Sequence, residues 1–593
     1  MMEDNKDGFV RILGVLIVMS VFMVFWQYLF PLPKTETPKE KAQADLAVVE
    51  NGGVVEGEDE DANNIRMSAK KGASGDVEIK QAADTNMPKV GAEQIKFGNE
   101  KITGYIDLMG ASIDGLTLVD YKDNVVGEEP VHLFYPAGTK NEYYVSFNWL
   151  AMSGGVTQAD LPNAKTVWSS NASFEKGEKY TKFDLTKEPL ILTHKNKLGQ
   201  TFIITITLDE GNMFTVTQKV LNNGSQAVEI YPYAQIKRHI SESESKDGFV
   251  GAVGTWDNSF KNVELKKLKK EDIIEKDTKG SFVGFSDKYW LTAIAPSVNS
   301  STDLIYALSK KSNGDEYIKI AALEKQCIVE PNGEGSSYFN IFVGPKDIDL
   351  LDKYSKEYDI KLLDHSIEFG KLYFICKPML LLLRFINNYV GNYGIAIIIM
   401  TIIIRGALFP LSNKSYKSMK KMRDLGPKLA ELKVTYADDQ KSLNQAMIDL
   451  YRKEDVSPIA GIWPLVLQLP IFFALYRVLY TSIEMRHSPF FGWITDLAAP
   501  DPTNIFNLFG LLHFTPPSFL HVGVLPLIMG LTMFIQQILA PTTMDNSKMN
   551  IMKYLPVVFI FIFARFPTGL LIYWTMSNVL SIIQQQVSTK FSK

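Results

Sequence analysis

An arginine interrupts a long apolar segment in the second half of the chain. Arg405 follows seven residues, 398–404, in which Thr401 is the single polar side chain and lies one helical turn before it. An ionised arginine at the centre of a bilayer costs roughly 2.5 to 3.5 kcal/mol or more, so its charge requires compensation. One interpretation is that Arg405 lies only five residues before Pro410, so that its side chain reaches the polar headgroups.

Other polar side chains in the later apolar segments favour a second interpretation. Each alone predicts a hydrogen bond between helices, worth about 0.6 kcal/mol. Asp and Glu are absent from these segments, so an arginine without an acidic partner would share a water-accessible groove with neutral polar groups. Such a positively charged groove attracts acidic or polar peptide segments. The polar residues are Gln468, Gln536, Gln537, Ser577 and Asn578.

The sequence disfavours several other chemistries. A proton-coupled or cation-coupled transporter normally carries a carboxylate within the membrane, and none is expected here. No P-loop pattern occurs, and the two cysteines, Cys327 and Cys376, lie in segments that we assign to different environments, which disfavours a disulfide. A net charge of −4 and a sequence pI near 6.1 give no reason to expect DNA binding. We therefore expect no enzyme activity, no cofactor and no metal site.

Six apolar segments are candidate transmembrane helices, five of them in a C-terminal core. The first, residues 12–30, holds roughly 19 nearly uninterrupted apolar residues, which matches a ~30 Å hydrocarbon core. A cleaved signal peptide is the alternative, but the run is long for one and lacks small residues at its end. We predict an anchor at 1–30 and further transmembrane helices at 391–411, 457–481, 522–540, 554–566 and 569–587.

The last two predicted helices are separated by a short break, Phe566-Pro567-Thr568-Gly569. Proline ends one helix there and glycine permits a tight reversal. A single long kinked helix is the alternative. The segment 554–566 covers only ~20 Å at 1.5 Å per residue, which favours local thinning of the bilayer.

Basic residues between the second and third predicted spans set the orientation. By the positive-inside rule this segment, 412–456, is cytoplasmic, as are the 541–553 loop, the short tail 588–593 and both termini. Apolar residues at helical spacing predict two helices that form a hairpin. Its basic face is either a solvated surface or a docking surface for the ribosome, lipid headgroups or incoming chains. The candidate docking residues are Lys414, Lys417, Lys420, Lys421, Arg423 and Lys428.

The polar part of the chain between the first and second spans is then extracytoplasmic. Residues 31–90 combine prolines with an acidic stretch and few aromatics, which predicts a disordered linker. Residues 91–347 alternate polar and apolar side chains with period two, as in the segment 201–208. This pattern predicts a large all-β sandwich domain.

Two further segments are expected outside the membrane core. Residues 348–390 predict connecting helices and an amphipathic helix at the membrane interface, on which Lys377 and Arg384 share one side. Residues 482–521 predict an extracytoplasmic loop between the third and fourth spans.

A set of short motifs marks the helical half of the chain. They are Val390-Gly391-Asn392-Tyr393-Gly394, the stretches 405–410, 464–472 and 566–570, the pair Ser577-Asn578, Gln584-Gln585-Gln586 and, more weakly, Pro541-Thr542-Thr543. With these residues the chain resembles the YidC/Oxa/Alb insertase family, and more closely its Gram-negative YidC branch, which has an extra periplasmic domain. The match spans essentially the whole chain.

The resemblance implies roles for single residues. Arg405 corresponds to the arginine of the family's hydrophilic groove, with Thr401 as a polar neighbour, and the candidate groove also includes Gln468, Ser577 and Asn578. Substrate helices are expected to move along a greasy slide. Its candidate residues are Pro464, Pro470, Ile471, Phe472, Tyr573 and Trp574, of which Trp574 departs from the family's usual aromatic residue.

The resemblance also implies a fold and a function. The chain would be an α-helical multi-pass membrane protein with a large periplasmic all-β supersandwich, a fold shared with sugar mutarotases; fold alone does not imply catalysis. It would act without ATP as an insertase and chaperone for inner-membrane proteins, alone or with the Sec translocon. Its partners would be nascent membrane proteins, the Sec translocon, the phospholipid bilayer and, through the 412–456 hairpin, the ribosome. The alternatives are a solute transporter or channel, and a membrane-anchored carbohydrate-active protein.

Overall fold

The structure is a computed structural model, and it describes most of the chain from residue 93 to residue 590. The predicted anchor at 1–30, the linker at 31–90 and the 541–553 loop lie outside the described residues. Within 93–590 the residues left undescribed are 126, 152–155, 176–177, 241–249, 257, 264–267, 269–272, 299, 311–315, 438, 455, 457–462, 513–515, 518–520 and 540–553.

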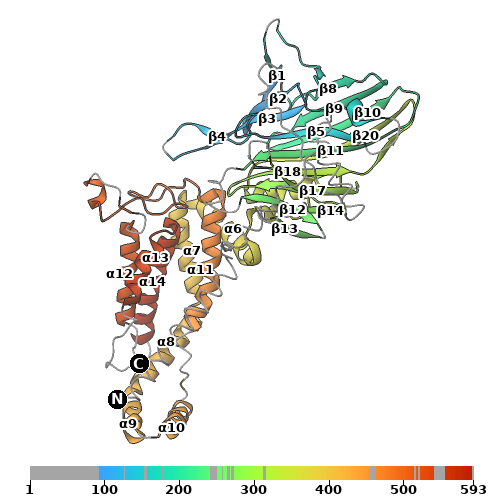
Figure 1. Ribbon diagram of the computed structural model, residues 1–593. Helices are drawn as coiled ribbons and strands as arrows, with labels where there is room; N and C mark the ends of the chain where they lie inside the picture. Colours follow the sequence, from blue (N-terminus) through green and yellow to red (C-terminus); the bar gives the residue numbers. More distant parts are fainter. Residues whose placement is uncertain are drawn as a thin grey trace, which may run out of the picture. The chain divides into compact units, whose positions relative to one another are not determined.

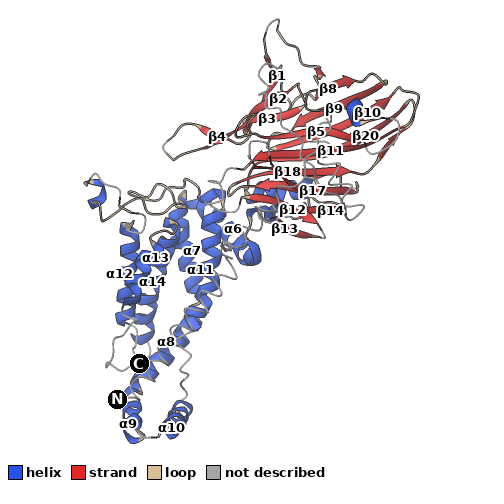
Figure 2. Ribbon diagram, viewed as in Figure 1, coloured by secondary structure: helices blue, strands red, loops and turns tan. Residues whose placement is uncertain are grey.

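The N-terminal half of the described chain forms two large β-sheets (Figures 1 and 2). The first is 11-stranded, in the order β14-β17-β18-β11-β5-β3-β2-β1-β7, with β19 paired to β11 and β4 to β3. Its strands are β1 Gln94–Gly98, β2 Ile102–Asp107, β3 Ser112–Lys122, β4 Pro130–His132, β5 Tyr143–Ala151, β7 Tyr180–Lys182, β11 Val228–His239, β14 Ile273–Thr278, β17 Thr302–Lys310, β18 Glu316–Glu324 and β19 Cys327–Val329.

The second sheet is 9-stranded, in the order β13-β12-β15-β16-β20-β10-β9-β8-β6. The last strand in the sequence, β20, therefore pairs with β16 on one side and with β10 on the other. The strands are β6 Ser169–Ser170, β8 Leu190–Lys195, β9 Gln200–Leu208, β10 Met213–Asn222, β12 Gly251–Trp256, β13 Ser259–Val263, β15 Val283–Ser286, β16 Trp290–Pro296 and β20 Gly333–Pro345.

The alternation of residue types in β9 produces the packing of this sheet. Every second side chain of the strand is buried, and the ring of Phe202 packs against Trp149 of the first sheet with 5.1 Å between centroids. Antiparallel pairing of β9 with β10 forms a β-hairpin. The Asp209 carboxylate closes its turn by accepting hydrogen bonds from the backbone N–H groups of Gly211 and Met213. One hydrophobic core thus includes residues of both sheets.

The C-terminal half is helical. Side chains cap several helices: Asp347 accepts hydrogen bonds at the start of α5, Asn392 at the start of α7 and Asp439 at the start of α10. The helices are α5 Ile348–Glu357, α6 Tyr373–Val390, α7 Tyr393–Ala407, α8 Phe409–Asp424, α9 Gly426–Thr435, α10 Gln440–Lys453, α11 Trp463–Thr481, α12 Val524–Leu539, α13 Leu555–Phe563 and α14 Thr568–Lys590. Among the described residues of this half there are also the 3-10 turns η3 Leu363–Ile367, η4 Gly370–Leu372, η5 Ile483–Met485 and η6 Leu508–Gly510, while η1 Gln158–Asp160 lies between β5 and β6.

Helices α7 and α8 differ in form from the predicted span followed by a hairpin. Residues 393–407 and 409–422 form two helices bent by 63° at Leu408. The apolar stripe expected on one hairpin helix is divided between α8 and α9, because the chain breaks at Leu425, ahead of Gly426 and Pro427. The hairpin itself is formed by α9 and α10 alone.

None of the described helices is by itself both long and apolar enough to cross a bilayer. The bent pair of α7 and α8 meets these criteria of length and composition when taken together, and α12 is a shorter apolar helix.

The break before the last helix is held by hydrogen bonds from a distant loop. Helix α13 ends at Phe563, and α14 begins at Thr568, so the two are separate helices. The backbone N–H of Thr568 donates to the carbonyl of Ala499 at 2.8 Å, and that of Gly569 to the carbonyl of Leu497 at 3.0 Å. The loop between α11 and α12 therefore fixes the reversal.

Helix α6 has a basic side next to an apolar side. Lys377 and Arg384 share the basic side, as the sequence predicts, and each forms ion pairs with carboxylates of neighbouring segments. Both side chains are therefore paired with carboxylates of the protein itself. The adjacent exposed apolar residues are Phe374, Leu381, Phe385 and Tyr389.

Candidate functional site

The candidate groove is centred on the C-terminal end of α7, where that helix packs against α14 (Figure 1). Arg405 is half-buried there. Its Nε donates a hydrogen bond to Ser577 Oγ at 2.9 Å, and its terminal Nη2 also donates to this hydroxyl. The side-chain amide of Gln584, two turns further along α14, donates to the backbone carbonyl of Arg405 at 3.0 Å.

The charge of Arg405 is held by neutral groups. In the part of the chain that the structure describes, Arg405 forms no ion pair, and its side-chain partner is the hydroxyl of Ser577. Ser577 is almost fully buried. A cation placed in this way keeps its capacity to attract a negative group, because no carboxylate of the described chain neutralises it.

Thr401 does not contact this cluster. Its side chain is fully buried, and its hydroxyl donates to the carbonyl of Ile397 in the preceding turn at 2.6 Å. Such a bond within one helix satisfies the hydroxyl locally. Thr401 thus lies on the predicted helix but uses its polar group for the helix itself.

Gln468 and Tyr573, predicted for the groove and the slide respectively, contact each other. The Gln468 amide donates a hydrogen bond to the Tyr573 hydroxyl, and the Tyr573 side chain is 1% exposed. This bond connects α11 with α14. One residue predicted for the groove is thus hydrogen-bonded to one predicted for the slide.

Asn578 belongs to a different contact of α14. Its Nδ2 donates to Thr532 Oγ1 of α12 at 3.1 Å, and Gln585 likewise donates to the carbonyl of Leu539 at 2.6 Å. These bonds hold α12 against α14 on a side separate from Arg405. Thr532 was not predicted as a site residue, and a single threonine in an apolar helix gives no signal of its role.

Gln584 was not predicted as a groove residue, although the sequence contains a signal for it. It lies seven residues after Ser577, on the same helical face, in the glutamine triplet of α14. A search for polar residues at that spacing from Ser577 would have found it.

Two residues of the predicted slide, Phe472 and Trp574, form an aromatic cluster with Phe563, which was not predicted. Phe472 of α11 packs edge-on against Trp574 of α14 with 4.8 Å between ring centroids, and Trp574 lies 4.9 Å from Phe563 of α13. Phe472 is 1% exposed, whereas Ile471 and Trp574 are half-buried. The accessible part of the predicted slide is therefore its edge. Pro470 lies inside α11, and Pro464 is the second residue of that helix.

The predicted docking residues divide between two helices. Lys414, Lys417, Lys420, Lys421 and Arg423 lie on α8. Lys428 lies on α9, where its Nζ is 2.7 Å from a carboxylate oxygen of Glu454. The basic series of the sequence is thus mainly a feature of one helix that follows the bend after α7.

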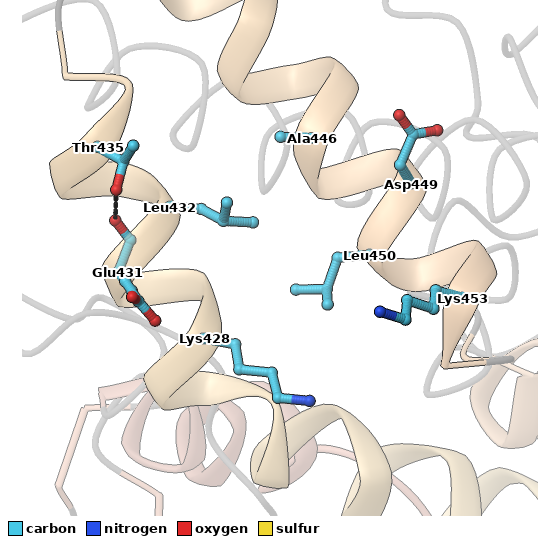
Figure 3. Close-up of a pocket in the computed structure, with 8 residues that line it drawn as sticks. All are labelled: Lys428, Glu431, Leu432, Thr435, Ala446, Asp449, Leu450 and Lys453. Carbon is cyan, nitrogen blue, oxygen red and sulfur yellow. Dashed lines mark hydrogen bonds between the residues drawn. The ribbon is translucent and has the colours of Figure 1, made fainter.

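A groove of about 510 Å³ lies between α9 and α10 (Figure 3). Leu432, Ala446 and Leu450 point into it from the two helices, and Lys428 and Lys453 lie at one end. Thr435 closes on its own helix, because its hydroxyl donates to the carbonyl of Glu431 at 2.9 Å. This groove is remote from Arg405 in the fold and shares no residue with the cluster at Ser577.

Comparisons with known proteins identify both halves of the chain. Residues 385–593 match the family described as 60Kd inner membrane protein, and residues 94–382 match the YidC periplasmic domain. The membrane protein insertase YidC of Rickettsia felis is 39% identical over 586 residues, covering 97% of this chain and 98% of that protein. The protein of the same name from Rickettsia prowazekii is 38% identical over 583 residues, with the same coverage.

Solved structures give more distant matches. A crystal structure of an active YidC insertase, with its first transmembrane domain resolved, is 18% identical, and the match covers 86% of this chain and 96% of that one with a TM-score of 0.34. A galactose mutarotase related enzyme from Lactobacillus acidophilus is 11% identical, with 42% of this chain and 97% of that chain covered and a TM-score of 0.30.

The relatives extend over almost the full length of the chain, and the two family regions coincide with its β-rich and helical halves. The predicted periplasmic β domain and helical C-terminal region are confirmed at this level. The chain belongs to the YidC family of membrane protein insertases, which are inner-membrane proteins with a periplasmic domain.

Proposed function

We propose that this chain inserts nascent membrane proteins by drawing their polar flanking segments into the groove at Arg405. The observation that carries the proposal is the half-buried guanidinium, bound to the hydroxyl of Ser577 and not to a carboxylate of the described residues. An acidic or polar segment of a client would supply the missing counter-charge for part of its path. Its apolar segment would then pass along the edge formed by Ile471 and Trp574 into lipid.

The membrane topology is part of this proposal. Six transmembrane helices are proposed, with both termini in the cytoplasm and residues 31–390 outside. The basic helix α8 supports a cytoplasmic position for the segment after α7. The short α13, which at 1.5 Å per residue is only about 13 Å long, supports a locally thin bilayer beside the groove.

The ribosome and anionic lipid headgroups are proposed partners that the charge of α8 supports. The lysines of α8 provide repeated cations for ribosomal RNA or anionic headgroups. Lys428 contributes less, because Glu454 already binds it. Cooperation with the Sec translocon is proposed from the membership of the family alone.

Substitution of Arg405 tests the groove. We expect Arg405→Gln to lower insertion of a client with an acidic outer segment by about tenfold, and to leave a client with a neutral segment within about twofold. Arg405→Lys keeps the charge and should retain more activity. Equal loss for both clients would contradict the electrostatic role and indicate a structural one.

Site-specific crosslinking tests the path. A photoreactive residue at Trp574 or Ile471 should capture a nascent membrane protein during its insertion. Val434, exposed on α9, is the matched control and should capture little. Absence of client crosslinks at both slide positions, in a protein that still inserts, would exclude this path.

A further inference from the structure

The loop between α11 and α12 carries an exposed apolar turn. Residues 505–512 form it, and we refer to them as the apolar turn. Four of its large side chains are strongly exposed, Leu508 at 51%, Phe509 at 60%, Leu511 at 77% and Leu512 at 45%. Exposed apolar side chains in a contiguous run of this kind mark an interaction surface.

The backbone holds these side chains outward at a conformational cost. Leu508 and Phe509 have φ of 51° and 60°, in the left-handed region that favours glycine or asparagine. Hydrogen bonds fix the turn, from the N–H of Phe509 to the carbonyl of Asn504 at 2.9 Å and from that of Leu512 to the carbonyl of Asn507 at 3.0 Å. A strained conformation that exposes apolar groups needs a compensating contact outside the described chain.

The turn is attached to the start of α12. The carboxylate of Asp501, 1% exposed, accepts hydrogen bonds from the N–H groups of Thr503 and Leu525 at 3.0 and 2.8 Å. The hydroxyl of Thr503 accepts from the N–H of Val524 at 2.9 Å. The depth of the apolar turn is therefore fixed relative to the first turn of α12.

Charge and composition restrict what can cover the turn. Between residues 488 and 544 the sequence has no Lys or Arg, and its only acidic residues are Asp496 and Asp501. Both carboxylates accept hydrogen bonds from nearby backbone N–H groups. Phe491 and Trp493 of the same loop are also exposed. Aromatic and aliphatic side chains without charges are typical of the membrane interface.

Helix α12 also has an exposed apolar face. Ile528, Leu531, Ile535 and Ile538 of that helix are exposed, at spacings that place them on one face. Residues 513–523 separate the apolar turn from α12, and within this segment 513–515 and 518–520 are not described. The proposed span therefore has an apolar extension at its outer end.

We propose that the apolar turn inserts into the outer leaflet of the membrane, with Phe509 and Leu511 among the lipid acyl chains. It thereby anchors the outer end of α12 at a fixed depth. This inference rests on the proposed spanning of α12, and it is independent of the groove at Arg405. The occupant is lipid rather than a protein partner, because the turn offers no charge for specific recognition and is tied through Asp501 to the start of α12, a helix whose exposed face is also apolar.

Spin labelling of the full-length chain in liposomes of phosphatidylethanolamine and phosphatidylglycerol tests the proposal. The labelled variants are Leu511→Cys, Leu531→Cys on α12 and Val434→Cys on α9, in a background in which Cys327 and Cys376 are replaced by serine and alanine. Val434, which is 80% exposed, is an apolar residue expected in the cytoplasm. We expect the label at 511 to be several-fold more accessible to oxygen than to a nickel chelate, like that at 531 and unlike that at 434.

The outcomes separate the possible causes. If the label at 531 is in lipid and the label at 511 is in water, insertion of the apolar turn is wrong while the spanning of α12 holds. If both are in water, the span fails as well. Protection at 511 that disappears when the protein is diluted in lipid would assign the turn to a second copy of the chain and overturn the proposal.

A second variant guards against loss of folding. Phe509→Asn keeps a residue that tolerates the left-handed backbone while removing the apolar ring. It should leave the elution volume in size-exclusion chromatography and the insertion activity unchanged. The accessibility of a spin label at 511 to the nickel chelate should rise by at least twofold. An unchanged accessibility would argue against insertion of the turn.

Discussion

Arg405 combines a permanent charge with a single neutral side-chain acceptor. The Ser577 hydroxyl receives both of its hydrogen bonds, so that the guanidinium is oriented but not neutralised. An aspartate in place of Ser577 would form a buried ion pair with Arg405 and neutralise its charge. Orientation without neutralisation is the property that a groove for passing acidic segments requires.

Removal of the Ser577 hydroxyl should loosen this orientation. We expect Ser577→Ala to reduce insertion of an acidic-flanked client about threefold to tenfold, less than the loss in Arg405→Gln, because the charge remains. Ser577→Thr retains the hydroxyl and serves as the matched control. The measurement is protease protection of the client in proteoliposomes, and an activity of Ser577→Ala equal to that of Ser577→Thr would show that the hydrogen bond is dispensable.

Glu484 is the clearest titratable group outside the spans. Its carboxylate lies 2.9 Å from Arg384, which also binds Asp347 and Asp349. Burial, and next the nearby charge of Asp347, raise the pKa of Glu484 to about 7, although Arg384 acts in the opposite direction. Three carboxylates around one guanidinium thus favour a protonated acid among them.

This raised pKa predicts a stability that falls as the pH rises. Below the ordinary glutamate pKa of 4.5, Glu484 is protonated in both the folded and unfolded states, and its full contribution is present. Between pH 4.5 and about 7 only the unfolded state ionises freely, so the free energy of unfolding decreases, by up to about 3 kcal/mol. Thermal unfolding in detergent from pH 5 to 8 measures it.

Glu484→Gln should flatten this dependence, since the amide does not titrate. Glu357→Gln, at the exposed end of α5, is the control and should leave the slope of wild type. If the unfolding temperature depends on pH in the same way in wild type and in Glu484→Gln, Glu484 ionises with the ordinary pKa of a glutamate.

At the scale of the elements, the start of α12 depends on one buried acid. Asp501 accepts hydrogen bonds from the N–H and hydroxyl of Thr503 and from the N–H of Leu525. Gly523 makes this approach possible, because a Cβ there would lie 2.4 Å from Asp501 Cγ. The loop and the helix are thus joined by side-chain chemistry as well as by the chain.

Asp501→Ala should destabilise the folded protein by about 2 kcal/mol, because it removes a cap and leaves buried N–H groups unsatisfied. Asp501→Asn keeps one acceptor oxygen but presents an amide to a backbone donor, so an intermediate loss is expected. The lowered temperature of unfolding in detergent is the measurement. An unfolding temperature for Asp501→Ala equal to that of wild type would mean that water replaces the carboxylate.

Local elements follow from local sequence, and their partners do not. The alternation in 201–208 gives β9, and Pro567 with Gly569 separates α13 from α14. The break at Leu425 escaped prediction because an apolar stripe continues through it, although Gly426 and Pro427 follow directly. Helix capping and breaks are decided by single residues, whereas periodicity averages over several turns.

At the scale of the molecule, a buried ionic cluster joins distant segments. Lys346 Nζ, after β20, lies 3.3 Å from Glu368 Oε1 and 3.1 Å from the hydroxyl of Ser286 in β15. Arg477 of α11 donates to the backbone carbonyl of Glu368 at 2.8 Å. The Lys346 and Glu368 side chains are 1% and 4% exposed, so this pair is dry.

Breaking this pair should have a large effect. Glu368→Gln leaves the Lys346 ammonium buried without a counter-ion, and we expect a loss of about 3–5 kcal/mol in the free energy of unfolding. The double variant Lys346→Met, Glu368→Leu should recover much of it. Denaturant unfolding measures both, with Lys101→Ala, from an exposed pair with Asp120, as the control. A double variant as unstable as the single one would contradict the charge argument.

Contacts between distant residues explain why the site could be predicted only in part. Arg405, Ser577 and Gln468 were recognised by type and position in apolar segments. Their partners were not, because Arg405 and Ser577 are 172 residues apart and Gln468 and Tyr573 are 105 apart. Phe472 and Trp574 were both predicted for the slide, but their packing against each other was not predicted. Pairing across such distances depends on the whole fold, which residue patterns do not contain.

The central position of β20 sets the order in which the periplasmic domain can be completed during synthesis. Until residues 333–345 emerge, the second sheet exists only as two unjoined parts, which end in the open edges of β10 and β16. At ~5–20 residues per second, the interval between the end of β10 and the end of β20 is on the order of ten seconds. Unpaired strand edges can mispair with other chains. The periplasmic domain is therefore most vulnerable to aggregation just before the helical half of the chain is synthesised.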